Sequence, residues 1–500
     1  MIRRLSKIEG ATGYCASSAA DLISYRRSSY DGPSKNFCAL MNRRQFLKTG
    51  AAAWTTALAG SSCLRAPRRE TLAPVKDLAV EWFNSLDDSI RSRVCVDYDH
   101  PLRQYHNRGV GLGGVGIGHG NFSWAQLKLL NRLFYAGLSE EGRGILPNEY
   151  FLRWTGIRML EVLIAGDPNS PYYQLFFSGP HMNLRLGGKS REGVAFGGPM
   201  VYGDQHGDSV PGLPGNIYQY QFHQGHDVFS SLSAGQRQQA LLRESPIQTQ
   251  IELQGDKGVF PGLPVSDLSR ESKRKTEDLI RGILKNYDAA DVAYARGCLE
   301  QNGGIDSLHL SYYQDGEVAK SGQYQIFRLE GPAAAFYFRG FPHVHAFINV
   351  AMDGNRPLSV GETLGENPAV LEGAAIKNLF EAAMKERARA DFAYYNTESV
   401  VGRLRAGVIR AGDVYNLESW GNALSVVSIK GSQLAGSEAG ELMRRGAALE
   451  SGKTYTVATT DYLAGERAST FGGGKAIAQN VLLRDVVIDY VKSHGFPRST

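Results

Sequence analysis

The chain has 500 residues and a formal net charge of +5 at pH 7. This length is enough for two or three domains. Several positive charges lie near the N-terminus, so the rest of the chain is close to neutral. The composition therefore gives no argument for a nucleic-acid partner, and we expect none.

The segment from Met41 to Lys48, Met-Asn-Arg-Arg-Gln-Phe-Leu-Lys, precedes a short, weakly apolar run that ends in small residues. This pattern resembles a twin-arginine export signal, which we assign to residues 41–63. The alternative is a basic surface segment before a short helix. Because Met41 is a sensible translation start, residues 1–40 are either an extension of the leader or a mis-assigned start. The resemblance implies the twin-arginine export machinery as a partner and a periplasmic or secreted protein.

The apolar run of the leader is too short to span a bilayer by itself, and we expect no transmembrane segment in the mature protein. Cys63 follows a poor lipobox, which argues against a lipid anchor. Residues 64–74 are predicted to be a linker. Beyond the leader only Cys95 and Cys298 remain, and they are either one disulfide or two thiols.

The first predicted domain covers residues 75–352 and begins with helical patterns. One helix is expected over residues 72–86, a second after the capping residue Ser123, and a third over residues 148–165. The glycine-rich residues 108–120 lack a preceding strand and a following helix, so we interpret them as turns and close backbone packing. Accordingly, no nicotinamide or flavin cofactor is expected.

Strands dominate the rest of this domain, in an antiparallel pattern. Residues 173–186 are predicted to be a strand with His181 at its entry, and residues 197–207 a strand and loop. Turn signals separate four later strands into an antiparallel meander. These strands are expected at residues 308–314, 324–329, 334–339 and 343–350, after helices at 232–243, 268–286 and 289–300. The fold class is therefore α+β, with N-terminal helices plus an antiparallel sheet.

Two histidines at the start of the last strand, His343 and His345, are two residues apart and would project from the same face. Together with His181 they offer three imidazoles and an open fourth position. Such a set could hold one divalent metal ion, zinc or another, that polarises a water molecule. The alternative is that His343 and His345 are ordinary half-buried strand residues.

Other catalytic patterns are weaker. Asp204 and His206 have the Asp-x-His spacing that opens metallophosphoesterase sites, but the Gly-Asp-x-x-Asp and Gly-Asn-His-Glu blocks that bind two ions are missing. No Gly-x-Ser-x-Gly elbow occurs, and Cys298 has no evident base partner in the sequence. Serine and cysteine hydrolase chemistry is therefore disfavoured.

The first domain contains the short motifs Leu138–Gly142, Gly166–Pro168, Ser178–His181, Gly198-Pro199 and His343-Val344-His345. Together these motifs resemble a family of exported bacterial proteins catalogued as a domain of unknown function (DUF3500-type). The resemblance covers about residues 75–352, and it lends no chemistry because none is established for the family. The family pattern has a doubled histidine where this chain has Pro180-His181.

The second predicted domain, residues 363–495, alternates helix and strand. It contains an ordered signature that comprises Ala390–Ala393, Asn396, Gly412–Tyr415, Trp420-Gly421-Asn422, Gly431–Leu434, Tyr455–Val457 and Asp461–Ala464. This signature resembles the C-terminal domain of the 5'-nucleotidase family, which implies an α/β domain that binds a nucleotide-like small molecule.

Carried over residue by residue, the resemblance implies substrate-binding roles for Asn396, Trp420, Asn422 and Tyr462, with Trp420 and Tyr462 clamping a base. The arginine of the family's Gly-Gly-Gly-Ile-Arg motif and the aspartate of its Gly-Gly-Asp-Gly motif are absent here. Two hypotheses therefore stay open. One is an exported metal-dependent hydrolase acting on nucleotide or phosphoester substrates, and the other is a non-catalytic exported ligand-binding or scaffold protein with a degenerate nucleotide site.

Overall fold

The computed structural model describes residues 73–106, 111–187, 193–206, 215–317, 321–396, 399–418, 420–437, 439–440, 449–465, 467–471 and 474–497. The predicted leader, residues 1–63, and most of the linker lie outside these ranges. Among the described residues, no helix is long and apolar enough to cross a membrane.

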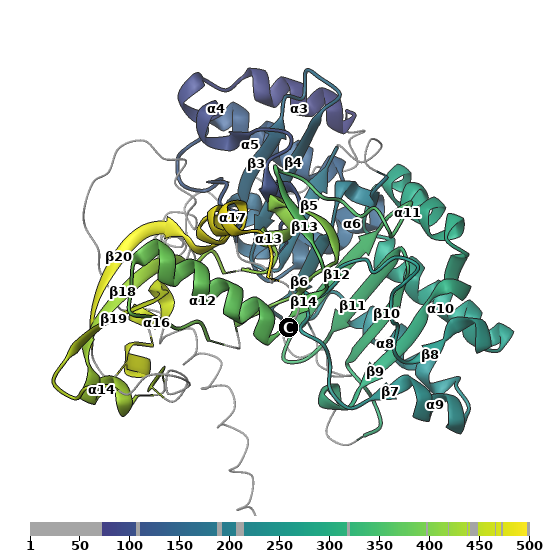
Figure 1. The fold of residues 1–500 in the computed structure, drawn as a ribbon. Coiled ribbons are helices and arrows are strands. Elements are labelled where there is room, and N and C mark those ends of the chain that lie inside the picture. Colours follow the sequence, from purple (N-terminus) through teal and green to yellow (C-terminus); the bar gives the residue numbers. More distant parts are fainter. Residues whose placement is uncertain are drawn as a thin grey trace, which may run out of the picture.

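One large mixed sheet contains the strands before residue 351, in the order β1-β3-β4-β5-β6-β12-β11-β10-β9-β7, with β2 on β3 and β8 on β9 (Figure 1). Most pairs are antiparallel, and the meander β9-β10-β11-β12 is confirmed. The strands are β1 Cys95–Val96, β2 Val115–Gly116, β3 Glu161–Gly166, β4 Tyr173–Gly179, β5 Met182–Leu186, β6 Met200–Asp204, β7 Leu241–Leu242, β8 Leu263–Pro264, β9 His309–Tyr313, β10 Ile326–Gly331, β11 Ala334–Arg339 and β12 Val344–Val350.

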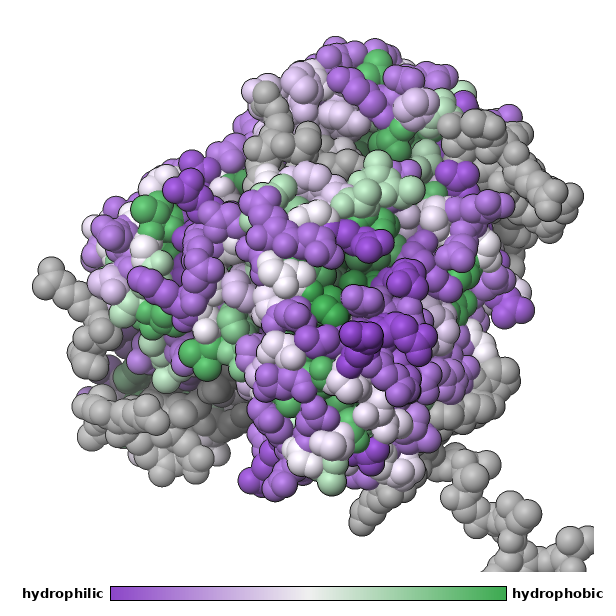
Figure 2. Space-filling model, turned by 90° about the vertical axis from the view of Figure 1, so that its right-hand side faces the viewer, coloured by the Kyte–Doolittle hydropathy of each residue, from purple (hydrophilic) through white to green (hydrophobic). Residues whose placement is uncertain are grey.

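Amphipathic helices cover one face of this sheet and form the largest core with it. Ser123 begins α5 with a capping box, because its side chain accepts from the Gln126 N–H while the Gln126 side chain accepts from the Ser123 N–H. The outer face of the layer at the right of Figure 1 is mainly hydrophilic, with small hydrophobic patches (Figure 2). The helices are α3 Val75–Asn84, α4 Asp88–Val94, α5 Trp124–Ala136, α6 Glu140–Ile145, α7 Leu152–Thr155, α8 Gln219–Ser230, α9 Ala234–Ala240, α10 Arg270–Leu284 and α11 Ala289–Gln301.

Two sequence predictions in this region were wrong. The helix expected over residues 148–165 is a series of short helical turns followed by the strand β3. Residues Glu161–Ala165 are buried throughout, and a continuous buried run has no periodicity that separates strand from helix. The single strand expected over residues 173–186 is instead the hairpin of β4 and β5, with His181 in its turn.

After residue 360 the strands form three smaller sheets: β13 with β17, β14 with β16, and a four-stranded sheet in the order β15-β19-β18-β20. The α+β fold class and the α/β character of the C-terminal part are confirmed. The strands are β13 Thr363–Asn367, β14 Leu371–Glu372, β15 Phe392–Ala393, β16 Arg403–Leu404, β17 Gly407–Arg410, β18 Ala423–Lys430, β19 Thr454–Thr460 and β20 Lys475–Leu482. The helices are α12 Ala374–Ala388, α13 Ala411–Tyr415, α14 Gly431–Ala435, α16 Asp461–Gly465 and α17 Leu483–His494.

The C-terminal part packs directly on the large sheet. Phe176 of β4 belongs to the same buried cluster as Phe380 of α12 and Val487 of α17. Polar contacts continue this interface, because Gln104 Nε2 donates to Asp413 Oδ1 over 2.7 Å. The two parts of the chain therefore share one core and do not meet only through exposed loops. Cys95 and Cys298 are both free thiols.

Candidate metal centre

Three histidines that are far apart in the sequence meet at one end of the large sheet. His181 lies in the turn between β4 and β5, His343 immediately precedes β12, and His345 is the second residue of β12. One ligand nitrogen from each of the three lies within 4.8 Å of the others. Among the described residues, this is the group of metal-ligating side chains that the fold brings together.

The alternation predicted for the last strand places the two later histidines correctly. Val344, Ala346 and Ile348 enter the core beneath the helices, whereas Phe347 joins the cluster on the opposite face. His345 therefore projects with Phe347, away from the helices. His343 and His345 approach each other with their Nε2 atoms 2.9 Å apart.

The spacing of the nitrogens is close to that of a bound site. Nitrogens about 2.0–2.1 Å from a tetrahedral ion lie about 3.3 Å from one another. The pair at 2.9 Å is slightly closer than that, and the 4.8 Å limit shows that His181 is the looser member.

Neighbouring side chains orient two of the rings. Gln248 Oε1 lies 3.1 Å from His345 Nδ1, so the Nδ1–H can donate to this amide, and Nε2, which lies 2.9 Å from His343 Nε2, then carries the lone pair. Phe151 stacks on His181 with ring centroids 5.8 Å apart. His181 Nδ1 is buried without a hydrogen-bond partner, which is a costly state unless another group takes its lone pair.

A glycine makes the approach of His181 to the strand feasible. Gly203 of β6 is the partner of His345 in the ladder. A Cβ at Gly203 would lie 2.2 Å from Val344 O and 3.2 Å from His181 Cβ. His181 itself has a positive φ of 58°, which a non-glycine residue adopts only in tight turns. The conformation of the β4–β5 turn and the lack of a side chain at Gly203 together allow the His181 ring to lie next to the rings of His343 and His345.

The protein environment favours the neutral forms of the His181 and His343 rings. Burial, followed by the nearby His343 and Arg339, holds the pKa of His181 well below its usual value. Burial and then Arg339 lower the pKa of His343 to about 4. Neutral imidazole is the form that binds metal ions, so at pH 7 these rings need not release a proton before they bind an ion.

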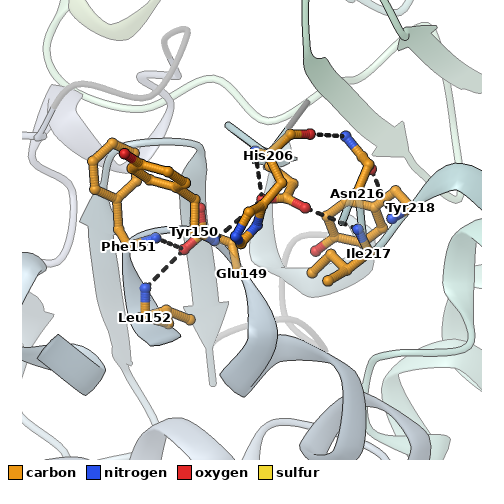
Figure 3. Close-up of polar contacts among 9 residues, drawn as sticks. Glu149, Tyr150, Phe151, Leu152, His206, Asn216, Ile217 and Tyr218 are labelled. Atoms are coloured by element: carbon orange, nitrogen blue, oxygen red, sulfur yellow. Dashed lines mark hydrogen bonds and ion pairs between the residues drawn. The ribbon is translucent and has the colours of Figure 1, made fainter. Parts of the chain in front are cut away.

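Asp204, the last residue of β6, and His206 just after it form the Asp-x-His pair, which has a structural role (Figure 3). Asp204 Oδ1 accepts from the backbone N–H groups of Tyr150 and His206 and lies 3.0 Å from His206 Nδ1. Its Oδ2 accepts from the Ile217 N–H over 2.8 Å. Because both oxygens already bind protein donors, this carboxylate ties three segments together and is not presented to a metal ion.

Figure 3 also shows a buried carboxyl group that the sequence did not single out. Glu149 Oε2 accepts from the N–H groups of Phe151 and Leu152, each over 2.9 Å. Burial, and to a smaller extent the charge of Asp204, raise its pKa to about 8. Glu149 thus caps the short turn that carries Phe151 to His181.

Sequence reasoning also missed Gln248 and Arg339. Gln248 lies 97 residues before His345, and no sequence pattern links them. Arg339 could have been found, because the predicted meander pairs it with the start of the next strand, and the structure pairs it with His345.

The residues expected to bind a nucleotide lie at one end of the four-stranded sheet. Trp420 and Asn422 precede β18, and Tyr462 follows β19, with Leu424 and Thr460 paired between them. Asn396 follows β15, which runs parallel to β19. The strand pairing therefore places all four residues at the same end of this sheet.

Three of these residues, Asn422, Asn396 and Tyr462, differ in their hydrogen bonding and packing at this end of the sheet. The Asn422 side chain donates to Glu418 Oε1 over 2.8 Å, and its backbone N–H donates to Glu418 Oε2. Burial raises the pKa of Glu418 to about 7, although Arg484 and Asn422 act in the opposite direction. Asn396 Oδ1 is buried without a partner, and Tyr462 packs partly against the core beneath this edge.

Comparisons with solved structures give low similarity to nucleotidases. A 5'-nucleotidase precursor from Thermus thermophilus is 14% identical with a TM-score of 0.25, covering 39% of this chain and 52% of its own. The NAD nucleotidase of Haemophilus influenzae is 12% identical with a TM-score of 0.22, covering 38% of this chain and 55% of its own. This chain thus spans about half the length of these proteins.

Comparison with curated proteins gives no match. Comparison with protein families gives two. Residues 359–437 match the family described as 5'-nucleotidase, C-terminal domain. Residues 68–348, more than half of the chain, match the family described as protein of unknown function (DUF3500). Both resemblances expected from the sequence are confirmed: the chain belongs to the DUF3500 family, and its residues 359–437 match the 5'-nucleotidase C-terminal domain family.

Proposed function

We propose that this protein is an exported metal-dependent hydrolase that acts on a nucleotide or another phosphoester. The observation that carries the proposal is the meeting of His181, His343 and His345, each from a different turn or strand position, with their ligand nitrogens within 4.8 Å. The proposed units are residues 75–352, with the metal site, and residues 363–495, with the substrate-binding edge.

The donor set fits one divalent ion. Imidazole nitrogens suit zinc, copper, nickel and iron, and three of them leave a coordination position open. When bound, such an ion would act as a Lewis acid toward a substrate oxygen or a water molecule. Among the residues of this chain, Gln248 fixes the tautomer of His345, and Phe151 fixes the plane of the His181 ring.

A short chain of contacts links this site to the C-terminal part. Gln248 touches His345, and the carbonyl of the next residue, Thr249, lies 2.9 Å from His106 Nε2. The His106 N–H donates to Asn416 Oδ1 over 3.2 Å. Glu418, two residues further on, holds Asn422. This continuity supports a function in which both parts act on one ligand.

The C-terminal contribution would be recognition. In its family this domain holds the nucleoside, and aromatic stacking contributes roughly 1–3 kcal/mol per base. Trp420 and Tyr462 lie at the edge where such a clamp would form. We propose that these two rings and Asn396 bind a nucleotide-like small molecule.

A second candidate is an exported ligand-binding or scaffold protein without catalysis. It is favoured by Asn422, whose amide is already engaged by Glu418. The absence of the family's arginine and aspartate points in the same direction. In this case the nucleotide edge would be a retained scaffold.

The two candidates are separated by measuring bound metal in the untagged protein, purified without chelators. We expect about one equivalent of a divalent metal, lost in the His343→Ala/His345→Ala double variant. His223→Ala is the control, because His223 is exposed on α8. The metal-loaded protein would then be assayed with p-nitrophenyl phosphate, AMP and other phosphoesters.

Metal in the wild type and the control but not in the double variant, together with turnover, would support the hydrolase. A metal-free wild type after incubation with Zn²⁺, Mn²⁺ and Ni²⁺ would refute the proposed mechanism. If nucleotides also failed to raise the melting temperature, the scaffold candidate would be favoured.

A further inference from the structure

We propose that Arg339 binds an oxyanion of the substrate, a phosphate or a carboxylate, directly beside the three histidines. This inference deepens the proposed function and rests on it, because it defines the class of molecule that enters the site. It does not follow from either family resemblance. Its evidence is the position of one arginine and the charge around it.

The β-ladder fixes the position of Arg339. It is the last residue of β11, and its partner in the antiparallel pairing with β12 is His345. Residues directly opposite each other in such a pair project from the same face, with their Cβ atoms about 4.5–5.5 Å apart. The guanidinium therefore starts on the histidine side of the sheet. Its Nη2 lies 3.5 Å from the carbonyl oxygen of His343, which places its end beside the site.

The guanidinium is incompletely satisfied. Its contact with the His343 carbonyl is at the outer limit of hydrogen bonding, and its Nε is buried without a partner. In the described part of the chain, no carboxylate forms an ion pair with it. A half-buried cation without a carboxylate partner is less well stabilised than a paired one, so a group that supplies negative charge would stabilise it.

Arg328 provides an internal comparison. It lies on the neighbouring strand β10, opposite Tyr337, and is buried, whereas Arg339 is half-buried. Its Nη2 forms a 2.7 Å ion pair with Glu330, and both side chains are about 6% exposed. The fold therefore neutralises one buried arginine of this sheet with a carboxylate and leaves the arginine beside the histidines without one.

The composition of the site points to the same ligand. Its donors are three histidines, with no aspartate or glutamate in the cluster. Neutral imidazoles do not offset the charge of a divalent ion, and Arg339 adds a further positive charge. An arginine guanidinium presents a planar fork of N–H donors that matches two oxygens of a phosphate or a carboxylate. An ion bound by the three histidines would add its positive charge to that of Arg339, and an oxyanion would be attracted to both.

The test is isothermal titration calorimetry on protein that carries one equivalent of Zn²⁺ after removal of free metal. Inorganic phosphate and acetate are the two probes, so that the arms distinguish a phosphoryl from a carboxylate ligand. The variants are Arg339→Gln and Arg339→Lys. Arg356→Gln is the control, because Arg356 has a side chain 90% exposed. Metal content and melting temperature are measured for every protein.

We expect Arg339→Gln to keep its metal and to bind the preferred oxyanion at least about tenfold more weakly, a change of about 1.4 kcal/mol. The oxyanion affinity of Arg339→Lys should lie between those of the wild type and Arg339→Gln, because lysine keeps the positive charge but lacks the planar guanidinium that can donate to two oxygens. The control should match the wild type. If Arg339→Gln fails to fold, wild-type affinity in Arg339→Lys overturns the proposal and weakened affinity supports it.

Two results would overturn the inference: wild-type affinity in a folded, metal-bearing Arg339→Gln variant, or no oxyanion binding by the wild type at millimolar concentration. Failure of the proposed function gives a different pattern. If the wild type takes up no metal but binds phosphate or acetate in an Arg339-dependent manner, the metal centre is refuted and the oxyanion site stands.

Discussion

The buried carboxyl group of Glu161 offers a quantitative test of the packing of the glycine-rich segment. Glu161 is 2% exposed, and its Oε2 accepts from the N–H groups of Gly113 and Gly114 over 3.1 and 3.0 Å. Its Oε1 has no partner. Burial raises the pKa of Glu161 from 4.5 to about 7, although the two glycine N–H groups act in the opposite direction. We predict that Glu161→Gln removes a specific part of the pH dependence of stability.

The sign follows from proton linkage. Because the folded pKa is above the unfolded one, the folded protein binds this proton more tightly. The stabilisation is fully present below about pH 4.5 and is lost as the pH rises through about 7. Each pKa unit corresponds to about 1.4 kcal/mol, so the whole loss is roughly 3 kcal/mol. Between pH 5 and pH 8 it is about 2.5 kcal/mol.

The assay is urea unfolding at pH 5 and pH 8, followed by circular dichroism. Relative to the wild type, Glu161→Gln should gain about 2.5 kcal/mol in free energy of unfolding when the pH rises from 5 to 8. Glu244→Gln is the matched control, because the Glu244 side chain is 80% exposed, and it should show no comparable change. An equal difference from the wild type at both pH values would show that Glu161 is not held in a buried, proton-binding state, and would refute the packing described for Gly113 and Gly114.

Two further predictions concern structural residues. Asp204→Ala should lower the free energy of unfolding by at least about 3 kcal/mol, since it leaves three backbone N–H donors without an acceptor; a shift below about 1 kcal/mol in urea unfolding would contradict this role. Phe176→Ala, at a position 0% exposed in the core shared by both parts of the chain, should cost about 3–5 kcal/mol. It should lower the melting temperature of the N-terminal and C-terminal parts together, whereas loss of one transition alone would argue against a shared core.

The local sequence predicted much of the fold and part of the site. Period-two alternation identified β12, and with it the common face of His343 and His345. Ser123 predicted the start of α5, because a capping box depends only on residues three apart. The order of short motifs was sufficient to place both family resemblances.

Sequence reasoning failed where neighbours distant in the chain decide the outcome. Residues Glu161–Gly166 form a strand and not the end of a helix, because they pair with β1, β2 and β4. The Asp-x-His spacing at Asp204 resembled a metal motif, but its oxygens accept from the backbone N–H groups of Tyr150, His206 and Ile217.

The sequence by itself determined which residue types were available: two histidines on one strand face, a third histidine after a glycine-proline pair, and a C-terminal domain of known family. Only the tertiary structure decided that His181 reaches the other two, because this depends on a hairpin turn and on the absence of a side chain at Gly203. It also decided that Gln248, which precedes His345 by 97 residues, lies beside them. A binding site is a set of distances between side chains, and distances between remote residues follow from strand order and register, which no local pattern encodes.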